Sequence, residues 1–179
     1  CEKILFKYKS KDFVTVVLRP ATVCGYSPRQ RLDLVVNILT NLAYHNREIT
    51  IFGGDQLRPN IHIQDIVRAY ELLINIEDEK VNGEIFNIGF ENLTVNQLAS
   101  EVQKIIGLDV KVKKLPTNDN RSYHISSKKI QDELGFVTKF TILNAIEDLK
   151  NAFEKNLLSS CLTNEDYYNI KKMQSIKLK

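Results

Sequence analysis

Arginine side chains recur in polar segments of this sequence that lie beside short apolar runs. Arg58 follows the apolar residues 49–52 and a glycine pair, Arg29 and Arg31 lie in a loop after another apolar run, and Arg121 lies in a third polar segment. A guanidinium group donates hydrogen bonds in a planar fork that fits a carboxylate or a phosphate. The arginines therefore favour an anionic ligand, and a diphosphate would engage several of them.

The cysteines and histidines show no pattern for metal binding or for a disulfide framework. They are Cys1, Cys24, Cys161, His45, His62 and His124. Their spacing contains no CxxC motif and no set typical of zinc sites. Widely spaced cysteines in odd number favour a reducing compartment, so we expect a cytoplasmic protein that binds no metal.

The composition is that of ordinary globular protein. The chain has 179 residues, of which 43% are hydrophobic and 26% are charged, and this suffices for one domain with its own core. The net charge of +3 is small and owes much to lysines near the C-terminus, so we expect no nucleic-acid partner. No apolar run approaches the length of a membrane span, and we expect no membrane association.

The periodicity of apolar residues predicts an α/β fold with a few strands and more helices. Strands are expected at 13–18, 49–52, 85–88 and 110–112, and a further short strand is expected between Arg58 and the helix that starts at residue 64. Helices are expected at 2–9, 32–44, 64–76, 94–106, 126–134 and 142–153. Residues 13–18 are β-branched and apolar throughout, which is typical of a parallel strand covered on both faces. The polar segment from residue 159 is assigned no element. Ligands of such folds bind beyond the carboxyl ends of strands, near which the arginine loops are expected.

Four segments in order resemble the extended short-chain dehydrogenase/reductase family, in particular its NAD-dependent sugar-nucleotide epimerases and dehydratases. The segments are 16–25 (Val-Val-Leu-Arg-Pro-Ala-Thr-Val-Cys-Gly), 52–65 (from Phe-Gly-Gly-Asp to Asp65), 85–89 (Ile-Phe-Asn-Ile-Gly) and 121–136 (from Arg-Ser-Tyr to Leu-Gly-Phe). Together they cover residues 1 to about 155 and resemble the C-terminal, substrate-binding half. The resemblance implies part of a Rossmann-type fold with a few parallel strands and a small, mainly helical substrate-binding lobe.

The resemblance also implies a domain plan. Residues 1–25 would end the Rossmann-like sheet, 26–158 would form the substrate-binding lobe with some strands returning to the sheet, and 159–179 would be a polar tail. The family's glycine-rich dinucleotide turn is absent from this sequence, and its catalytic Tyr-x-x-x-Lys is expected just upstream of Cys1. No catalytic residue is therefore assigned, and NAD or NADP would be bound mainly by the N-terminal half that this chain lacks.

Two other Tyr-x-x-x-Lys matches occur in the polar C-terminal segment, Tyr167 with Lys171 and Tyr168 with Lys172. A catalytic tyrosine needs a neighbouring lysine that lowers its pKa and a cofactor to work against. A solvated tail offers neither, so we predict that these matches are not catalytic.

The resemblance gives substrate-binding roles to eight residues and places two at the cofactor. The eight are Arg58, Arg121, Asn87, Arg31, Leu32, Thr22, Thr50 and Phe52, and the two at the nicotinamide are Pro20 and Ala21. The two arginines at 58 and 121 would hold the diphosphate, and the residues at 50 and 52 would line the nucleobase slot. The threonine at 22 stands where many members carry asparagine, and Cys24 replaces a tyrosine.

Each role has a plainer alternative. Arg58 could form a surface ion pair with Asp55 or Asp65, Asn87 could cap a turn, and Arg29 competes with Arg31 for contact with the substrate.

The expected function is that of the substrate-binding half of a cytoplasmic NAD(P)-dependent sugar-nucleotide epimerase or dehydratase. The intact enzyme would transfer hydride at a sugar carbon of a nucleotide-diphosphate sugar and could be a homodimer, whereas this chain alone would be inactive. One alternative is an extended-family reductase of a hydroxy-ketone that carries no nucleotide. Another is a non-catalytic module that binds nucleotide sugars.

Overall fold

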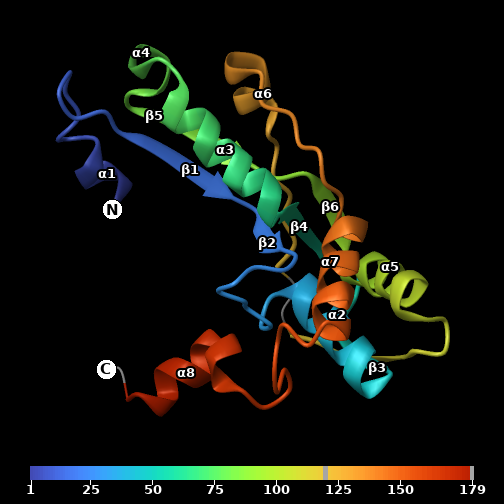
Figure 1. The fold of residues 1–179 in the computed structure, drawn as a ribbon. Coiled ribbons are helices and arrows are strands. Elements are labelled where there is room, and N and C mark those ends of the chain that lie inside the picture. The colour runs from blue at the N-terminus through green and yellow to red at the C-terminus, as the bar shows by residue number, and fades with distance from the viewer. Residues whose placement is uncertain (119–120, 178–179) are drawn as a thin grey trace.

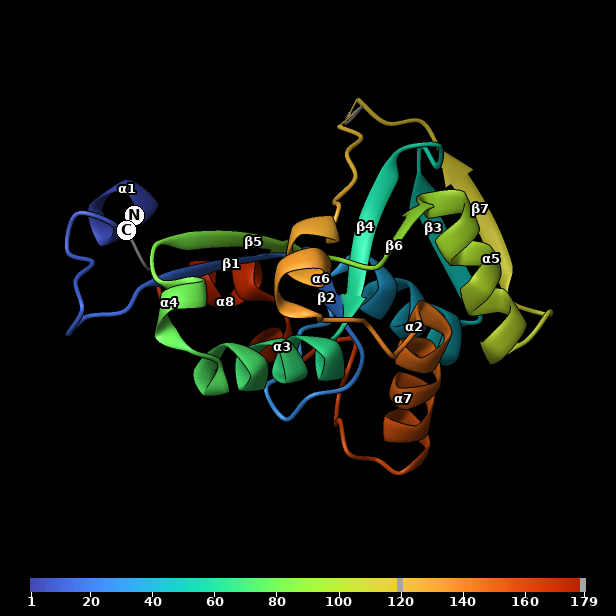
Figure 2. The same cartoon turned by 90° about the horizontal axis from the view of Figure 1, so that it is seen from above.

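Helices packed on three small β-sheets make up the fold of this chain (Figure 1). The computed structural model describes residues 1–118 and 121–177. Figure 2 shows two sheets and their helices at opposite ends of the molecule, joined by the third sheet. The α/β class that the sequence predicts is confirmed.

The first sheet pairs β1 (Val16–Pro20) with β5 (Glu84–Ile88) in parallel, with Val17 opposite Ile85. Phe86 and Ile88 are fully buried in a core that also contains Ala69 of α3 (Ile63–Asn75) and Ile130 of α6 (Lys128–Leu134). Short helices α1 (Glu2–Leu5) and α4 (Asp78–Val81) lie near this end of the molecule (Figure 1).

The second sheet joins β2 (Thr22–Cys24), β4 (Leu57–His62) and β6 (Glu91–Thr94). Strand β4 lies in the middle, parallel to β2 and antiparallel to β6. Two glycines at the start of the β3–β4 connection have positive φ angles, +74° at Gly53 and +121° at Gly54, so the chain can turn there at little steric cost.

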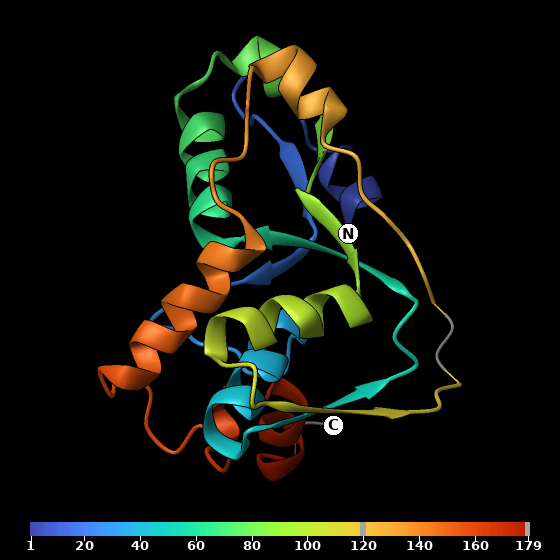
Figure 3. The ribbon, with the colours of Figure 1, turned by 90° about the vertical axis from the view of Figure 1, so that its right-hand side faces the viewer.

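The third sheet pairs β3 (Glu48–Phe52) with β7 (Lys111–Leu115) in parallel. Helices α2 (Val35–Asn46), α5 (Val95–Ile106) and α7 (Ile142–Glu154) bury a core against it, in which Ile49, Leu98 and Ile146 have no exposed surface. Figure 3 shows the segment 121–127, which leads into α6, running along one side of the molecule, and the Leu57 N–H at the start of β4 donates to the Ser122 hydroxyl at 3.0 Å.

The C-terminal segment folds back onto the molecule. It forms the short 3-10 helix η1 (Glu165–Tyr167) and helix α8 (Asn169–Ser175). Leu158 and Cys161 are buried with Leu32 of the loop before α2 and with Leu149 and Phe153 of α7. The apolar anchors at 158 and 161 explain why a segment of polar composition is ordered.

Several sequence predictions need correction. The segment from residue 159 forms two elements rather than none, and the connection at 21–31 contains β2. Strand β1 ends at Pro20 instead of residue 18. Its residues 16–18 are half-buried rather than covered on both faces, and within the described residues β1 pairs only with β5, so one edge of the strand is also open. Arg58 lies in strand β4 instead of a loop. Strand β6 and helix α4 were not predicted.

Within residues 1–118 and 121–177, no helix combines the length and apolarity that crossing a membrane requires.

Candidate functional site

A cavity of about 410 Å³ lies between strand β2 and the loop at residues 25–34. Its lining includes Ala21, Thr22, Gly25, Arg31 and Asn37. Strand β2 and the loop before α2 thus bring together three residues that the sequence singles out, at 21, 22 and 31. Because the cavity is open and both polar and apolar groups line it, it suits a ligand with a polar ring and an anionic group.

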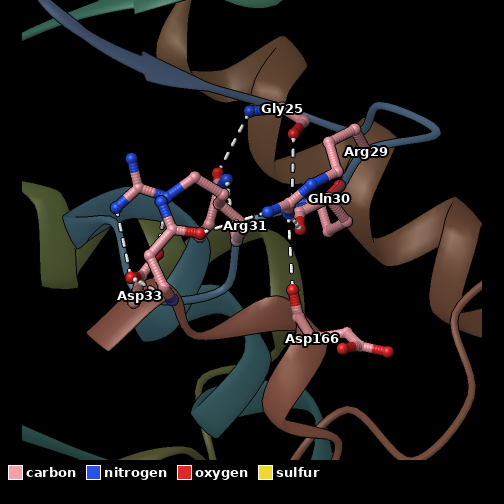
Figure 4. A network of polar contacts seen from close by, with 8 residues as sticks. Gly25, Arg29, Gln30, Arg31, Asp33 and Asp166 are labelled. Atoms are coloured by element: carbon pink, nitrogen blue, oxygen red, sulfur yellow. Dashed lines mark hydrogen bonds and ion pairs between the residues drawn. The ribbon is translucent and has the colours of Figure 1, made fainter. Parts of the chain in front are cut away.

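Buried amide side chains give the loop its shape (Figure 4). The Gln30 side chain donates to the carbonyl oxygens of Gly25 (3.4 Å) and Arg31 (3.0 Å). Asn37 donates to the same Arg31 oxygen at 2.8 Å and accepts from the Gly25 N–H at 3.1 Å. Gly25 has φ of +102°, and a Cβ there would lie 3.2 Å from His62 Nε2, so both conformation and space favour glycine.

Arg31 is held by Asp33. Its Nε and Nη2 atoms donate to the two carboxylate oxygens of Asp33 at 2.9 and 3.1 Å. Burial pushes the pKa of Asp33 upward, but hydrogen bonds from Arg31 and from the Asn169 backbone outweigh it, so the pKa lies below its ordinary value. Arg31 therefore stays oriented at the cavity beside an ionised carboxylate.

Arg58 meets the 121–123 segment at the start of β4. Its Nη1 atom donates to the carbonyl oxygens of Leu57, at 3.1 Å, and of Arg121. The guanidinium carbon lies 6.0 Å from the centre of the Tyr123 ring, within reach of a cation–π contact. The structure thus brings the two predicted arginines together at the main chain of residue 121, whose side chain is exposed.

Thr50 and Phe52 lie on strand β3, at the end that leads into the glycine turn. Phe52 is 55% exposed, so its ring is not part of the core. Gln56 closes the turn by donating to the Phe52 carbonyl oxygen at 2.7 Å and accepting from the Gly54 N–H at 2.6 Å. An exposed ring beside such a turn can pack on a flat ligand.

The remaining predicted residues lie in different surroundings. Asn87 is exposed on β5, where it pairs in register with Arg19. Pro20 is exposed at the end of β1, and the Ala21 N–H that follows donates to the Ile88 carbonyl oxygen at 2.7 Å. Leu32 has no exposed surface and packs in the core beside α7, so its side chain does not reach the cavity in this conformation.

Cys24 and His62 are buried and poorly suited to acid–base work here. Burial, with the nearby charge of Glu91, raises the pKa of the Cys24 thiol to about 12. His62 Nδ1 accepts from the Gln64 N–H at 3.1 Å, which leaves the proton of the neutral ring on Nε2, 3.2 Å from Asp148 Oδ2. Burial lowers the pKa of His62. Each side chain instead links two elements: Cys24 of β2 donates to the Ile61 carbonyl oxygen of β4, and His62 of β4 lies beside Asp148 of α7.

In the C-terminal Tyr-x-x-x-Lys matches, Tyr168 and both lysines make contacts within the fold. The Tyr168 hydroxyl donates to the Cys161 carbonyl oxygen at 2.8 Å and accepts from Asn41 at 3.2 Å, and burial raises its pKa. Lys171 Nζ lies over the Tyr168 ring, 4.3 Å from its centre, while Lys172 pairs with Asp166 at 2.7 Å. A raised pKa is the opposite of what a catalytic tyrosine needs.

In the part of the chain that the structure describes, no group of three or more His, Cys, Asp or Glu side chains is arranged to hold a metal ion.

Sequence reasoning missed the residues that shape the loop, namely Gln30, Asp33, Asn37 and Asn169. The first three stand close together in the printed sequence as polar residues at the start of an apolar helix, which is a usable signal for a loop held by side chains. Asn169 gives no such signal, because its contact with the loop spans 136 residues.

Residues 1–89 match the NAD dependent epimerase/dehydratase family. The UDP-glucose 4-epimerase of Thermotoga maritima, solved with UDP-glucose, is 30% identical, with a TM-score of 0.74 over 88% of this chain and 52% of that one. The resemblance to this family that the sequence predicts is confirmed over these residues. Its fold is part of a Rossmann-type domain of the extended short-chain dehydrogenase/reductases, as predicted.

More distant members of the epimerase/dehydratase group share the fold. The Helicobacter pylori ADP-L-glycero-D-manno-heptose-6-epimerase is 21% identical, with a TM-score of 0.72 over 86% of this chain and 48% of that one. The Bacillus cereus UDP-glucuronic acid 4-epimerase, solved with UDP-glucuronic acid and NAD, is 22% identical, with a TM-score of 0.71 over 87% and 49%. This chain thus spans about half the length of the solved structures it matches.

Proposed function

We propose that this chain supplies the substrate-binding part of an NAD(P)-dependent sugar-nucleotide epimerase or dehydratase. The match of residues 1–89 to the epimerase/dehydratase family and the likeness to a UDP-glucose 4-epimerase at 30% identity support the reaction class. The observation that carries the substrate class is the meeting of Arg58 with the 121–123 segment, 63 residues further along the chain. Two arginines and a tyrosine ring gathered from distant segments suit a nucleoside diphosphate.

The residues of this chain would bind and orient the ligand. Arg58 and Arg121 would contact the diphosphate, and the exposed ring of Phe52 would pack against the nucleobase. The sugar would extend toward the cavity lined by Thr22 and Arg31, where hydroxyl and guanidinium groups can hold its hydroxyls.

Of this chain, only Pro20 and Ala21 would contact the nicotinamide cofactor. When bound, nicotinamide supplies the group that accepts and returns hydride. The small side chain of Ala21 lines the cavity beside the exposed Pro20, which fits the approach of a flat ring. The seven glycines of the sequence form no Gly-x-x-Gly-x-x-Gly turn, so we place most of the dinucleotide outside these residues and expect this chain alone to be inactive.

Isothermal titration of the 179-residue chain with UDP-glucose tests the diphosphate contact. We expect Arg58→Ala and Arg121→Ala each to weaken binding about tenfold or more, because each removes a charge-assisted hydrogen bond. Lys104→Ala serves as the matched control, since this lysine lies in the last turn of α5 and pairs there with Glu101.

A reductase that acts on a hydroxy-ketone without a nucleotide would not need these arginines. Affinity for UDP-glucose that is unchanged in the double variant, while the fold is intact by circular dichroism, would overturn the diphosphate contact. A parent chain that binds UDP-glucose and also stays monodisperse at every concentration would favour the non-catalytic binding module, because the substrate-binding part of a larger enzyme is expected to expose an apolar edge.

A further inference from the structure

The C-terminal segment 157–177 is hydrogen-bonded to the loop that borders the cavity. Arg29 Nη1 donates to the Asp166 carbonyl oxygen at 3.3 Å, and its Nη2 donates to Asn169 Oδ1 at 3.3 Å (Figure 4). The Leu32 N–H donates to the Tyr167 carbonyl oxygen at 2.8 Å. The loop is therefore tied to the segment through both side-chain and main-chain atoms.

Asp33 connects this segment to the cavity. Its Oδ2 atom accepts from the Asn169 backbone N–H at 3.0 Å and from Arg31 Nη2 at 3.1 Å. Asn169 thus acts on Arg31 through Asp33, because the position of the shared oxygen decides where the guanidinium can be held. Arg31 lines the cavity, whereas Asn169 does not.

The segment is itself firmly anchored. Cys161 and Leu158 are buried against α7 and the loop, and Tyr167 and Tyr168 pack on the same core. The Tyr168 hydroxyl donates to the Cys161 carbonyl oxygen, and Asn41 of α2 donates to that oxygen at 3.2 Å. Because the segment is anchored in the core, its hydrogen bonds to Arg29 and Leu32 can hold the loop in one position.

We propose that residues 157–177 position the cavity loop, and that the Asn169 backbone N–H, through Asp33, orients Arg31 toward an anionic or hydroxyl group of a nucleotide sugar. The ligand part of this inference rests on the proposed function. Asn169 is a positioning residue, since it contacts Asp33 and not the cavity.

Proline at position 169 removes the N–H with little cost to the helix. Asn169 is the first residue of α8, and the preceding Tyr168 is extended (φ −126°, ψ 97°). Proline is well tolerated at the first position of a helix and prefers an extended residue before it. Asn169→Ala keeps the N–H and removes only the contact with Arg29, and Asn169→Asp keeps both kinds of contact. Met173→Ala, at an exposed position of α8, is the control for the segment.

The first readout is the titration of the Asp33 carboxyl by ¹³C NMR. We expect Asn169→Pro to raise the pKa of Asp33 toward its ordinary value, and Asn169→Ala and Met173→Ala to leave it low. Arg31 donates to this carboxyl and Tyr168 lies within electrostatic reach of it, and neither residue is substituted in any of these variants. We also expect the Leu32 amide to exchange with solvent faster in Asn169→Pro alone.

The second readout is affinity for UDP-glucose in the 179-residue chain. We expect Asn169→Pro to weaken binding about five- to tenfold, and Asn169→Asp to bind like the parent. If the parent chain does not bind UDP-glucose, the proposed function fails, and the Asp33 titration still decides whether the segment positions the loop. An unchanged Asp33 pKa and Leu32 exchange in a folded Asn169→Pro variant would overturn the inference. The inference would also be overturned if the parent chain binds UDP-glucose and the Asn169→Pro variant binds it with the same affinity.

Discussion

His62 and Asp65 lie buried where strand β4 passes into helix α3, and each connects distant segments. Asp65 accepts from the main-chain N–H groups of Lys139 and Phe140, at 3.0 Å each, and also pairs with Arg68. His62 stacks on the Phe140 ring with centres 4.9 Å apart. Sequence spacing alone offered Asp65 as an ion-pair partner for Arg58, whereas the structure uses it to hold the segment before α7.

Stability should depend on pH through His62. Burial lowers its pKa, and the charges of Asp148 on α7 and Asp65 on α3 only partly oppose this. The unfolded chain therefore takes up the proton at a higher pH than the folded chain does. This contribution to stability is complete above about pH 6.5 and is lost as the pH falls below that value.

Urea unfolding of the chain between about pH 5 and pH 7 measures this contribution. His62→Asn keeps an acceptor for the Gln64 N–H at a position before a helix, where asparagine is favoured. We expect the free energy of unfolding to fall less steeply with acid in this variant than in the parent. Equal slopes would show that His62 does not carry the dependence.

At the scale of elements, capping residues next to the helix in sequence explain why the starts of α5 and α7 could be predicted. Thr94 and Thr141 each accept from the backbone N–H three residues on, and the side chains of Gln97 and Asn144 bond back to the threonine N–H groups. These reciprocal bonds satisfy donors that the first turn of a helix leaves without partners. Both threonines can be recognised from residues within one turn.

Removing either cap should destabilise the fold by about 1 kcal/mol. We expect Thr94→Ala and Thr141→Ala to lower the free energy of unfolding by this amount in urea titrations, and Thr→Ser at the same positions to lower it much less. A serine variant as destabilised as the alanine variant would show that the threonine methyl group matters instead of the cap.

Long-range pairing explains the elements that the sequence did not place. Strand β6 forms because residues 91–94 pair with residues 57–60 of β4, and this pairing also draws Arg58 and Pro59 into a strand. Proline is usually excluded from strands, so the local pattern there favours a loop. The convergence of Arg58 with the Arg121 segment could be predicted from the family pattern. The roles of Asp33 and Asn169 could not, since they depend on a segment that folds back from the C-terminus.

At the scale of the whole molecule, apolar side chains are exposed on both sides of strand β1, near helix α1 on one side and on helix α3 on the other (Figure 3). Ile4, Phe13 and Tyr70 are more than half exposed, and Ile74 is 79% exposed. Within the described residues, β1 pairs with β5 alone. An apolar face beside an unpaired strand edge promotes association between molecules.

We expect this chain to associate with increasing concentration through the apolar surface that α3 and β1 form around Tyr70 and Ile74. Ile74→Lys should shift sedimentation-velocity profiles toward the monomer and leave the free energy of unfolding within about 0.5 kcal/mol of the parent. Leu108→Lys is the matched control, because Leu108 is 84% exposed but lies after α5, at the other end of the molecule. A parent chain that stays monomeric at every concentration would contradict this expectation.

The contacts between the cavity loop and the C-terminal segment also bear on biosynthesis. Arg29 and its two acceptors are 137 and 140 residues apart in the chain. At about 5–20 residues per second, a ribosome makes the segment about 7–28 s after the loop. The nascent chain can form its local helices during that interval, but the cavity acquires its final border only after residues 166–169 have been synthesised.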